Sequence, residues 1–248
     1  YFLKSEDLES SFEDAIFGTE IDVAKVTEWT VTVGDTVILP SKSVRNIGVI
    51  MDSEFSLDNQ ISDKIRSCYS QLYSLSKIRK YLTFDTTKTL VHALVTSRLD
   101  NLNSLLINSY EGQIKRLQKV QNNAARLITR QKKSESITNT LFSLHWLPIE
   151  QRIIYKILLL ICKCKLNIAP LYLQSLITPY IPNNYNLRSS KKNNLCTNRT
   201  NKRYGDRAFR TIGPKLWNKL PLELKTCSTI QTFKTKLKTL LFQEAYTV

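Results

Sequence analysis

The chain has 248 residues, 42% of them hydrophobic, which is enough to bury one large or two small cores and argues against wholesale disorder. Its formal net charge of +15 is unevenly spread: residues 1–60 hold 4 basic and 12 acidic residues, whereas residues 61–248 hold 32 basic and 9 acidic ones. A basic body predicts binding to a polyanion such as nucleic acid, although solubility or an AT-rich codon bias explains the same charge.

The first residue is Tyr1 and the only methionine is Met51, so we expect the chain to be a fragment. Its start is acidic, unlike a secretory signal. The most apolar run, residues 153–162, is about half as long as a bilayer span and contains Lys156. We therefore expect an intracellular protein without membrane contact, with no preference between nucleus and cytoplasm.

The five cysteines are odd in number and widely scattered, which argues against a disulfide framework. Cys162 and Cys164 form a CxC pair in an apolar helical run, whereas zinc sites ordinarily combine two CxxC-type pairs. We expect reduced thiols and no bound metal.

The N-terminal part predicts a small β structure. Residues 1–28 are acidic and only weakly helical in pattern. Residues 28–40 alternate around Gly34-Asp35, which favours a hairpin with a type II′ turn. The stretch VRNIGVIM, residues 44–51, predicts a third strand.

From Ser56 the hydrophobic period changes to that of helices, so the fold class is mainly α. A first helix of about six turns has one apolar face. Asp85 is expected to cap a second helix, and a third spans residues 111–130. The apolar face of the first helix holds Ile61, Ile65, Cys68, Leu72, Leu75 and Ile78, and that of the third holds Ile114, Leu117, Gln121, Ala124, Ala125 and Ile128.

The C-terminal half predicts further helices. Pro148 suits the first turn of one helix, and a short helix follows Pro170. Residues 180–203 are polar and basic, which indicates a flexible loop. The last helix is expected to start at Ser228, with Gln231 completing a capping box. Its apolar stripe is Phe233, Leu237 and Leu240, and core anchors are expected at Trp146, Phe209 and Trp217.

Four stretches in order carry a family resemblance: SVRNIGVIMDSEFSLDNQI, then LVHALVTSRLDNLNSLL with IKRLQKVQNNAARLITR, then LHWLPIEQRIIYKILLL, and finally YGDRAFRTIGPKLWNKLPLEL with FKTKLKTLLF. Over residues 30–248 the chain resembles the C-terminal third of reverse transcriptases from non-LTR (LINE-type, jockey-like) retrotransposons. The resemblance implies a fragment of an RNA-directed DNA polymerase.

The resemblance also implies a domain plan. Residues 1–28 are an acidic segment outside the family pattern, and residues 29–55 are the β remnant of the polymerase palm. Residues 56–135 form a thumb-like helical bundle, joined by a helical connection (136–179) and a basic loop (180–204) to a C-terminal helical segment (205–248). Whether this last segment packs on the thumb is left open.

The catalytic part of the parent family is not recognisable in this chain. Nucleotidyl transfer uses two metal ions held by clustered carboxylates. The family supplies them partly through an [FY]-A-D-D turn, which does not occur here, and its Lys-Thr-Glu segment is also missing. The acidic pairs Glu6-Asp7 and Glu13-Asp14 do not lie between apolar strand segments. We therefore interpret them as part of solvent-exposed helix faces and not as metal ligands. We expect no catalysis and no cofactor, because only the missing palm would require Mg²⁺.

Other catalytic arrangements are weak. His92 lies on an apolar helical pattern, and His145 has no Cys or Ser nucleophile with a supporting acid nearby, so both are expected to be structural. No phosphate-cradling GxxxxGK[ST] motif occurs.

Nucleic-acid contacts are the favoured expectation. Lysines and arginines on one side of a helix neutralise phosphates, and the helix at 111–130 gathers such a cluster, although a solvated charged face explains it too. The loop is a second cluster, and the palm correspondence adds Arg45 and Asn46 on the primer side. The candidates are Arg45, Asn46, Lys115, Arg116, Lys119, Arg126, Arg130, Lys132, Lys133, Arg188, Lys191, Lys192, Arg199, Lys202 and Arg203.

Two alternatives stay open beside binding to template RNA and primer. One is a helical interaction module whose basic face meets an acidic protein. The other is a translated relic of a mobile element without function. The sequence does not indicate an oligomeric state.

Overall fold

A computed structural model describes residues 31–33, 36–38, 41–181, 193–200 and 203–246 of the chain. The chain divides into two compact units, residues 1–64 and residues 65–248. The predicted acidic segment 1–28 lies outside the described residues.

The N-terminal unit contains two small antiparallel sheets. Strands β1 (Val31–Val33) and β2 (Thr36–Ile38) pair with Val31 opposite Ile38, which confirms a hairpin here, while its turn residues lie outside the described part. Strands β3 (Ser43–Asn46) and β4 (Val49–Asp52) form the second sheet, with Ser43 opposite Asp52. The sequence predicted one three-stranded β structure. Among the described residues there are instead two sheets of two strands each.

The stretch VRNIGVIM is therefore a hairpin and not a single strand. Ile47 and Gly48 have φ angles of 47° and 77°, and two successive positive φ angles are what a two-residue type I′ turn requires. The sequence pattern did not predict this turn, because a β-branched residue such as Ile47 strongly disfavours a positive φ angle. The Ile47 side chain is 90% exposed at the tip, so its apolar character reflects no core position.

Asp52 links this hairpin to the following helix. Its carboxylate accepts hydrogen bonds from the backbone N–H groups of Ser56, at 2.6 Å, and Leu57, at 2.8 Å. The Gln60 side-chain oxygen accepts a bond from the Ile50 N–H at 2.8 Å. These bonds fix the chain just before helix α2, which runs over Asp58–Ile78 and contains the boundary between the two units.

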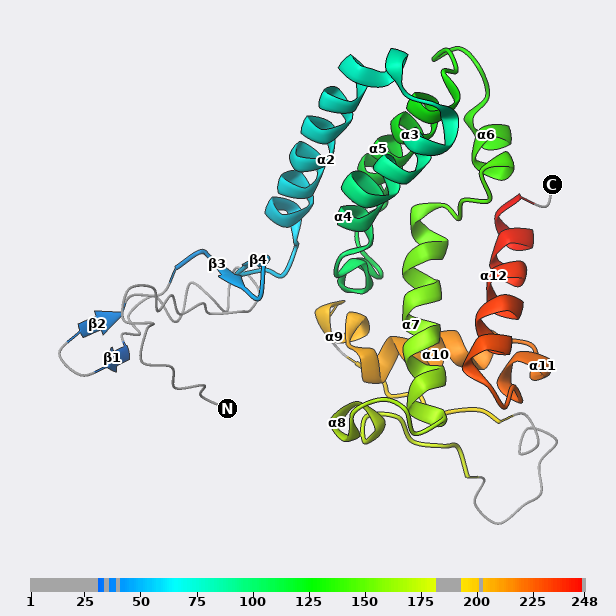
Figure 1. The fold of residues 1–248 in the computed structure, drawn as a ribbon. Coiled ribbons are helices and arrows are strands. Elements are labelled where there is room, and N and C mark those ends of the chain that lie inside the picture. The colour runs from blue at the N-terminus through cyan, green and yellow to red at the C-terminus, as the bar shows by residue number, and fades with distance from the viewer. Residues whose placement is uncertain (1–30, 34–35, 39–40, 182–192, 201–202, 247–248) are drawn as a thin grey trace. The chain divides into compact units, whose positions relative to one another are not determined.

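The C-terminal unit is helical (Figure 1). After α2 it contains the 3₁₀-helix η1 (Arg79–Tyr81), α3 (Phe84–Val91), the π-helix η2 (His92–Thr96), α4 (Ser97–Asp100), the 3₁₀-helix η3 (Asn103–Leu106), α5 (Glu111–Thr129), α6 (Ile137–Ser143), α7 (Ile149–Lys165), α8 (Leu171–Gln174), α9 (Arg203–Arg207), α10 (Phe209–Lys219), α11 (Leu222–Lys225) and α12 (Ile230–Tyr246).

Helix α7 is the centre of this unit. It contacts α5 and η3 on one side and α10 and α12 on the other, so the segment from residue 205 onward packs against the preceding helices (Figure 1). Its residues Ile153, Ile157 and Ile161 are buried. A Cβ atom at Gly213 of α10 would lie 3.2 Å from the Ile161 Cδ1 atom, so glycine permits the close approach of α10 to α7.

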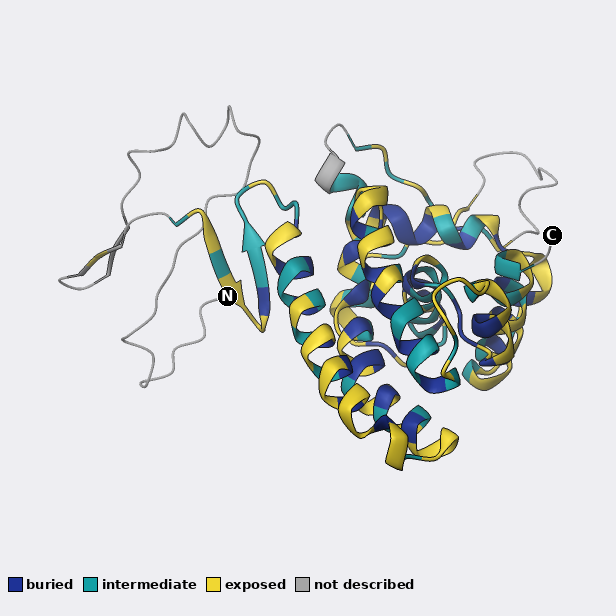
Figure 2. Ribbon diagram, turned by 90° about the horizontal axis from the view of Figure 1, so that it is seen from above, coloured by how far each residue is buried: buried dark blue, intermediate teal, exposed yellow. Residues whose placement is uncertain are grey.

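Apolar stripes at helical spacing supply the core, and Figure 2 shows buried residues on the inward faces of the helices. In α2 the predicted positions are mostly buried, whereas Ile78 is exposed. Trp146 and Trp217 are core residues as expected, while Phe209 is half-buried. In α12 the buried stripe is Phe233, Leu237 and Leu241, so the third position is Leu241 and not Leu240.

Two helix caps differ from the sequence-based expectation by one or two residues. Thr83, and not Asp85, caps α3: its hydroxyl oxygen accepts a bond from the Thr86 N–H at 3.2 Å. Thr229, and not Ser228, caps α12 by accepting from the Thr232 N–H at 3.3 Å. Threonine is nearly as good a cap as Asp or Ser, so composition did not distinguish the neighbours.

Part of the predicted flexible loop 180–203 is fixed. Leu195 is buried and forms an antiparallel bridge with Pro179. The Asn218 side chain of α10 accepts a bond from the Leu195 N–H at 2.8 Å and donates one to the Leu195 carbonyl at 2.9 Å, as a neighbouring strand would. This short stretch of the polar segment is therefore attached to the helical core, and residues 182–192 lie outside the described part.

Candidate nucleic-acid interface

Helix α5 forms where the sequence predicted it. One side chain accepts a hydrogen bond from a backbone N–H group at the start of the helix, and the inward face of the helix is apolar. The Gln113 side chain accepts a hydrogen bond from the Tyr110 N–H at 3.2 Å, as in a capping box. Leu117, Ala124 and Ile128 are buried on the inward face. Gln121, also buried there, donates from Nε2 to the Leu147 carbonyl at 2.9 Å, which ties α5 to the turn before α7.

Lysines lie on the outward face of α5. Lys115 and Lys119 are exposed and one turn apart, so they share that face, and the exposed Arg116 lies on its flank. The Lys115 Nζ atom is 2.6 Å from the Glu111 carboxylate in an exposed pair, and this hydrogen bond lowers the pKa of Glu111. Exposed pairs of this kind are weak and screened by salt, so Lys115 remains available to a stronger anion.

The two arginines nearer the end of α5 are partly committed to the protein. Arg126 is half-buried, and its Nε–H group is buried with no hydrogen-bond acceptor among the residues that the structure describes. Arg130 ends the helix in the left-handed region, with a φ angle of 59°, and its Nη2 atom donates to the Arg79 carbonyl at 3.2 Å. Of the five predicted cations on this helix, Arg126 is half-buried, and the other four are exposed.

Arg79 closes the C-terminus of α5, and sequence reasoning did not find it. Its guanidinium group is 9% exposed and donates to the carbonyls of Leu127 and Ile128, each at 2.7 Å. These are carbonyls that a helix end leaves without intrahelical partners. Burial, followed by the nearby Arg130, lowers the pKa of Arg79. Because these partners lie about fifty residues apart in the sequence, no local pattern reveals the contact.

The remaining candidates lie in three places. Lys132 and Lys133 are exposed in the turn after α5, and the Lys132 N–H donates to the Glu135 carboxylate at 3.3 Å. Arg45 and Asn46 are exposed on β3 of the N-terminal unit, where the Arg45 guanidinium is 4.0 Å from the Asp63 carboxylate. Arg199 is exposed, Arg203 begins α9, and Arg188, Lys191, Lys192 and Lys202 lie outside the described residues.

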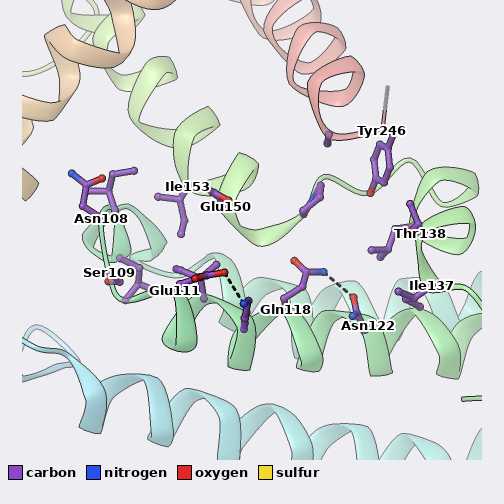
Figure 3. A pocket seen from close by; sticks show the side chains of 17 residues that line it. Asn108, Ser109, Glu111, Gln118, Asn122, Ile137, Thr138, Glu150, Ile153 and Tyr246 are labelled. Atoms are coloured by element: carbon purple, nitrogen blue, oxygen red, sulfur yellow. Dashed lines mark hydrogen bonds and ion pairs between the residues drawn. The ribbon is translucent and has the colours of Figure 1, made fainter. Parts of the chain in front are cut away.

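A cavity of about 570 Å³ lies beside α5, between α5, α6, the start of α7 and the end of α12 (Figure 3). Gln118 crosses it, accepting from the Ile149 N–H at 2.9 Å and donating to the Asn122 side chain at 2.8 Å. The carboxylates of Glu111 and Glu150 border the same cavity. Lys115 also lines this cavity, where its ammonium group is paired with Glu111, so the cavity meets the basic face at this residue.

The two histidines are held by aromatic contacts. The His92 ring is 5.3 Å from the Trp146 ring, and partial burial together with Arg152 lowers the His92 pKa. His145 has a φ angle of 55°, and its ring stacks on Phe242 at 5.8 Å. The pattern of the sequence gave no sign that the two rings lie near the same cleft, which is formed by residues from several helices.

The cysteines are free thiols, with Cys68, Cys162 and Cys164 buried. Burial raises the pKa of Cys162 to about 11, so this thiol is protonated at neutral pH. Within the described residues, no three His, Cys, Asp or Glu side chains come together as metal ligands.

Comparison with protein-family models, curated proteins and solved structures found no match for this chain. None of the described helices combines the length and the hydropathy that a bilayer span needs.

Proposed function

We propose that this chain is a C-terminal part of a non-LTR retrotransposon reverse transcriptase, and that it binds the duplex of template RNA and primer through the outward face of α5. The four sequence stretches described above support the family, and the exposed side chains of Lys115, Arg116 and Lys119 support the binding. The observation that carries the proposal is that these cations project from a helix whose two ends are both fixed by hydrogen bonds.

The spacing of the lysines suits a nucleic-acid backbone. Lys115 and Lys119 are four residues apart, which is about 6 Å along a helix axis. Successive phosphates of one strand are about 3.4 Å apart along the duplex, so the two lysines fit phosphates two nucleotides apart. Contacts of this kind carry no sequence information, so the binding would show little sequence preference.

The proposed role is to hold nucleic acid while a palm domain elsewhere polymerises DNA. This chain has no [FY]-A-D-D sequence, so we propose that it does not catalyse nucleotidyl transfer by itself. In a primer-extension assay with Mg²⁺ and a primed RNA template, we expect no product. Templated synthesis by the purified chain would contradict this part of the proposal.

The binding is tested by changing Lys115, Arg116 and Lys119 together to Ala, which preserves helix propensity. We expect the affinity for an RNA–DNA hybrid to fall about tenfold or more, and the slope of log affinity against log salt to decrease by about 2 to 3. The matched control changes Lys219, Lys234 and Lys236 to Ala, which removes the same charge from α10 and α12.

Two results would contradict the proposal. An unchanged affinity in the α5 triple variant would show that this face is only solvated. Displacement of the hybrid by polyglutamate at physiological salt would favour the alternative of an acidic protein partner, because a protein surface would then compete better than phosphates.

A further inference from the structure

A second basic site lies in a cleft that the α5 face does not include. The cleft has a volume of about 270 Å³ and is formed by η2, α4, the turn before α7, α7 itself and α12. The residues that matter for its chemistry are His92, Asp100, Trp146, Arg152, Lys156 and Lys238. They come from five separate stretches of the sequence, so only the fold brings them together.

Arg152 is fixed in this cleft by Asp100. Its Nε atom donates to one carboxylate oxygen of Asp100 at 2.8 Å, and its Nη2 atom donates to the other. The bidentate pair holds the guanidinium in place and neutralises its charge. Any further charge in the cleft must therefore come from other residues.

Two lysines supply that charge. Lys156 follows Arg152 by one turn on α7, and Lys238 reaches the cleft from α12. Both are exposed, and within the described part of the chain the structure gives neither an ion-pair partner. Two ammonium groups from different helices thus border one concave site without a compensating carboxylate, which attracts an anion.

Trp146 and His92 provide independent evidence. Trp146 lines the cleft and is 4% exposed, and its buried indole N–H has no acceptor among the described residues. An unpaired buried donor is costly, so a small shift of this side chain that brings the N–H to an acceptor oxygen in the cleft would be favoured. Partial burial, then Arg152 and Lys88, lower the pKa of His92, while Asp100 opposes them.

We propose that this cleft binds the dianionic phosphate of a phosphomonoester. A phosphate dianion carries the two negative charges that balance Lys156 and Lys238, and its oxygens accept several hydrogen bonds. The cleft is larger than a phosphate alone, and Trp146, Leu147 and Tyr155 give it an apolar and aromatic wall. A ring-bearing organic group such as a nucleoside fits that wall. A nucleoside monophosphate is therefore the class of ligand that matches both the two lysines and the aromatic wall.

The proposal does not depend on the proposed function, because it uses none of the α5 cations. It is tested by calorimetric titration of the whole chain with inorganic phosphate, adenosine 5′-monophosphate and adenosine at constant ionic strength. We expect both phosphates to bind, the nucleotide more tightly, and adenosine not to bind detectably. Failure of both phosphates to bind at millimolar concentration would overturn the proposal.

Matched variants locate the binding. Changing Lys156 and Lys238 together to Gln is expected to weaken nucleotide binding about tenfold or more, since two charge-assisted hydrogen bonds are lost. Changing Lys163 and Lys236 to Gln removes one charge from each of the same helices outside the cleft, and we expect an affinity within about twofold of the parent chain. An equal loss in both variants would refute a site in this cleft.

The source of the phosphate is resolved by competition with a short oligonucleotide carrying either a 5′-phosphate or a 5′-hydroxyl. Competition by the 5′-phosphorylated strand alone would show that the cleft accepts strand ends as well as free nucleotides, and competition by neither would restrict it to free phosphomonoesters. Equal competition by the 5′-hydroxyl strand would mean that the cleft binds backbone diesters, which would overturn the proposal. The α5 triple variant should bind the nucleotide as the parent chain does.

Discussion

Replacing Arg79 by Met tests how the C-terminal unit is held together. The Arg79 guanidinium donates to the carbonyls of Leu127 and Ile128 at 2.7 Å and to that of Leu82 at 2.8 Å. Methionine keeps much of the aliphatic stem and its packing but removes all three hydrogen bonds. The variant therefore isolates the contribution of the charged head group.

The expected loss of stability is about 3 kcal/mol. Each hydrogen bond from a charged donor contributes roughly 1.5–3 kcal/mol to stability. The sum over the three bonds is therefore larger than the expected net loss. Removing the guanidinium also relieves the cost of burying a charge, which is several kcal/mol and offsets part of that sum. For a unit of this size the net loss corresponds to a melting temperature lower by about 6–12 °C.

The measurement is urea and thermal unfolding followed by far-ultraviolet circular dichroism. Arg66→Met is the matched control, because Arg66 is exposed on α2 and loses the same charge, so its stability should change by less than about 0.5 kcal/mol. If Arg79→Met unfolds at the same urea concentration as Arg66→Met, the guanidinium does not stabilise the end of α5.

Two further predictions concern α12 and its last turn. Thr229→Ala should destabilise the chain by about 1 kcal/mol in urea unfolding, because it removes the cap of α12, whereas Ser228→Ala should have a much smaller effect; equal effects would show that Thr229 is not the cap. Burial raises the pKa of Tyr246 to about 12, so the unfolded chain, with a pKa near 10, loses this proton first and stability falls between about pH 10 and 12. Tyr246→Phe, which also loses the bond to the Trp146 carbonyl, should be less stable at pH 7 but should lose stability less steeply over that alkaline range, and parallel pH profiles would contradict the assignment.

The sequence predicted the elements that depend on local periodicity. Helix α5 was expected over residues 111–130 and spans Glu111–Thr129, because a repeated apolar face and a polar start are both visible in one stretch. The hairpin of β3 and β4 was missed because its turn begins with Ile47, a residue that normally signals a strand.

The sequence could not predict contacts between distant residues. The basic residues of α5 were identified from spacing, but the closure of the helix end by Arg79, and its contact with Arg130, exist only in the folded chain. The second cleft depends on Lys156 and Lys238, which are more than eighty residues apart and belong to different apolar patterns. Such juxtapositions follow from tertiary packing, which one-dimensional patterns do not encode.

The central position of α7 affects how the protein must be synthesised. Translation delivers residues 149–165 well before residues 209–246, yet the latter form the helices that cover one side of α7. Until that later segment has left the ribosome, Ile161, which α10 approaches at Gly213, has no covering helix on that side. Apolar surface uncovered during synthesis promotes aggregation, so the nascent chain is vulnerable to aggregation until α12 has emerged.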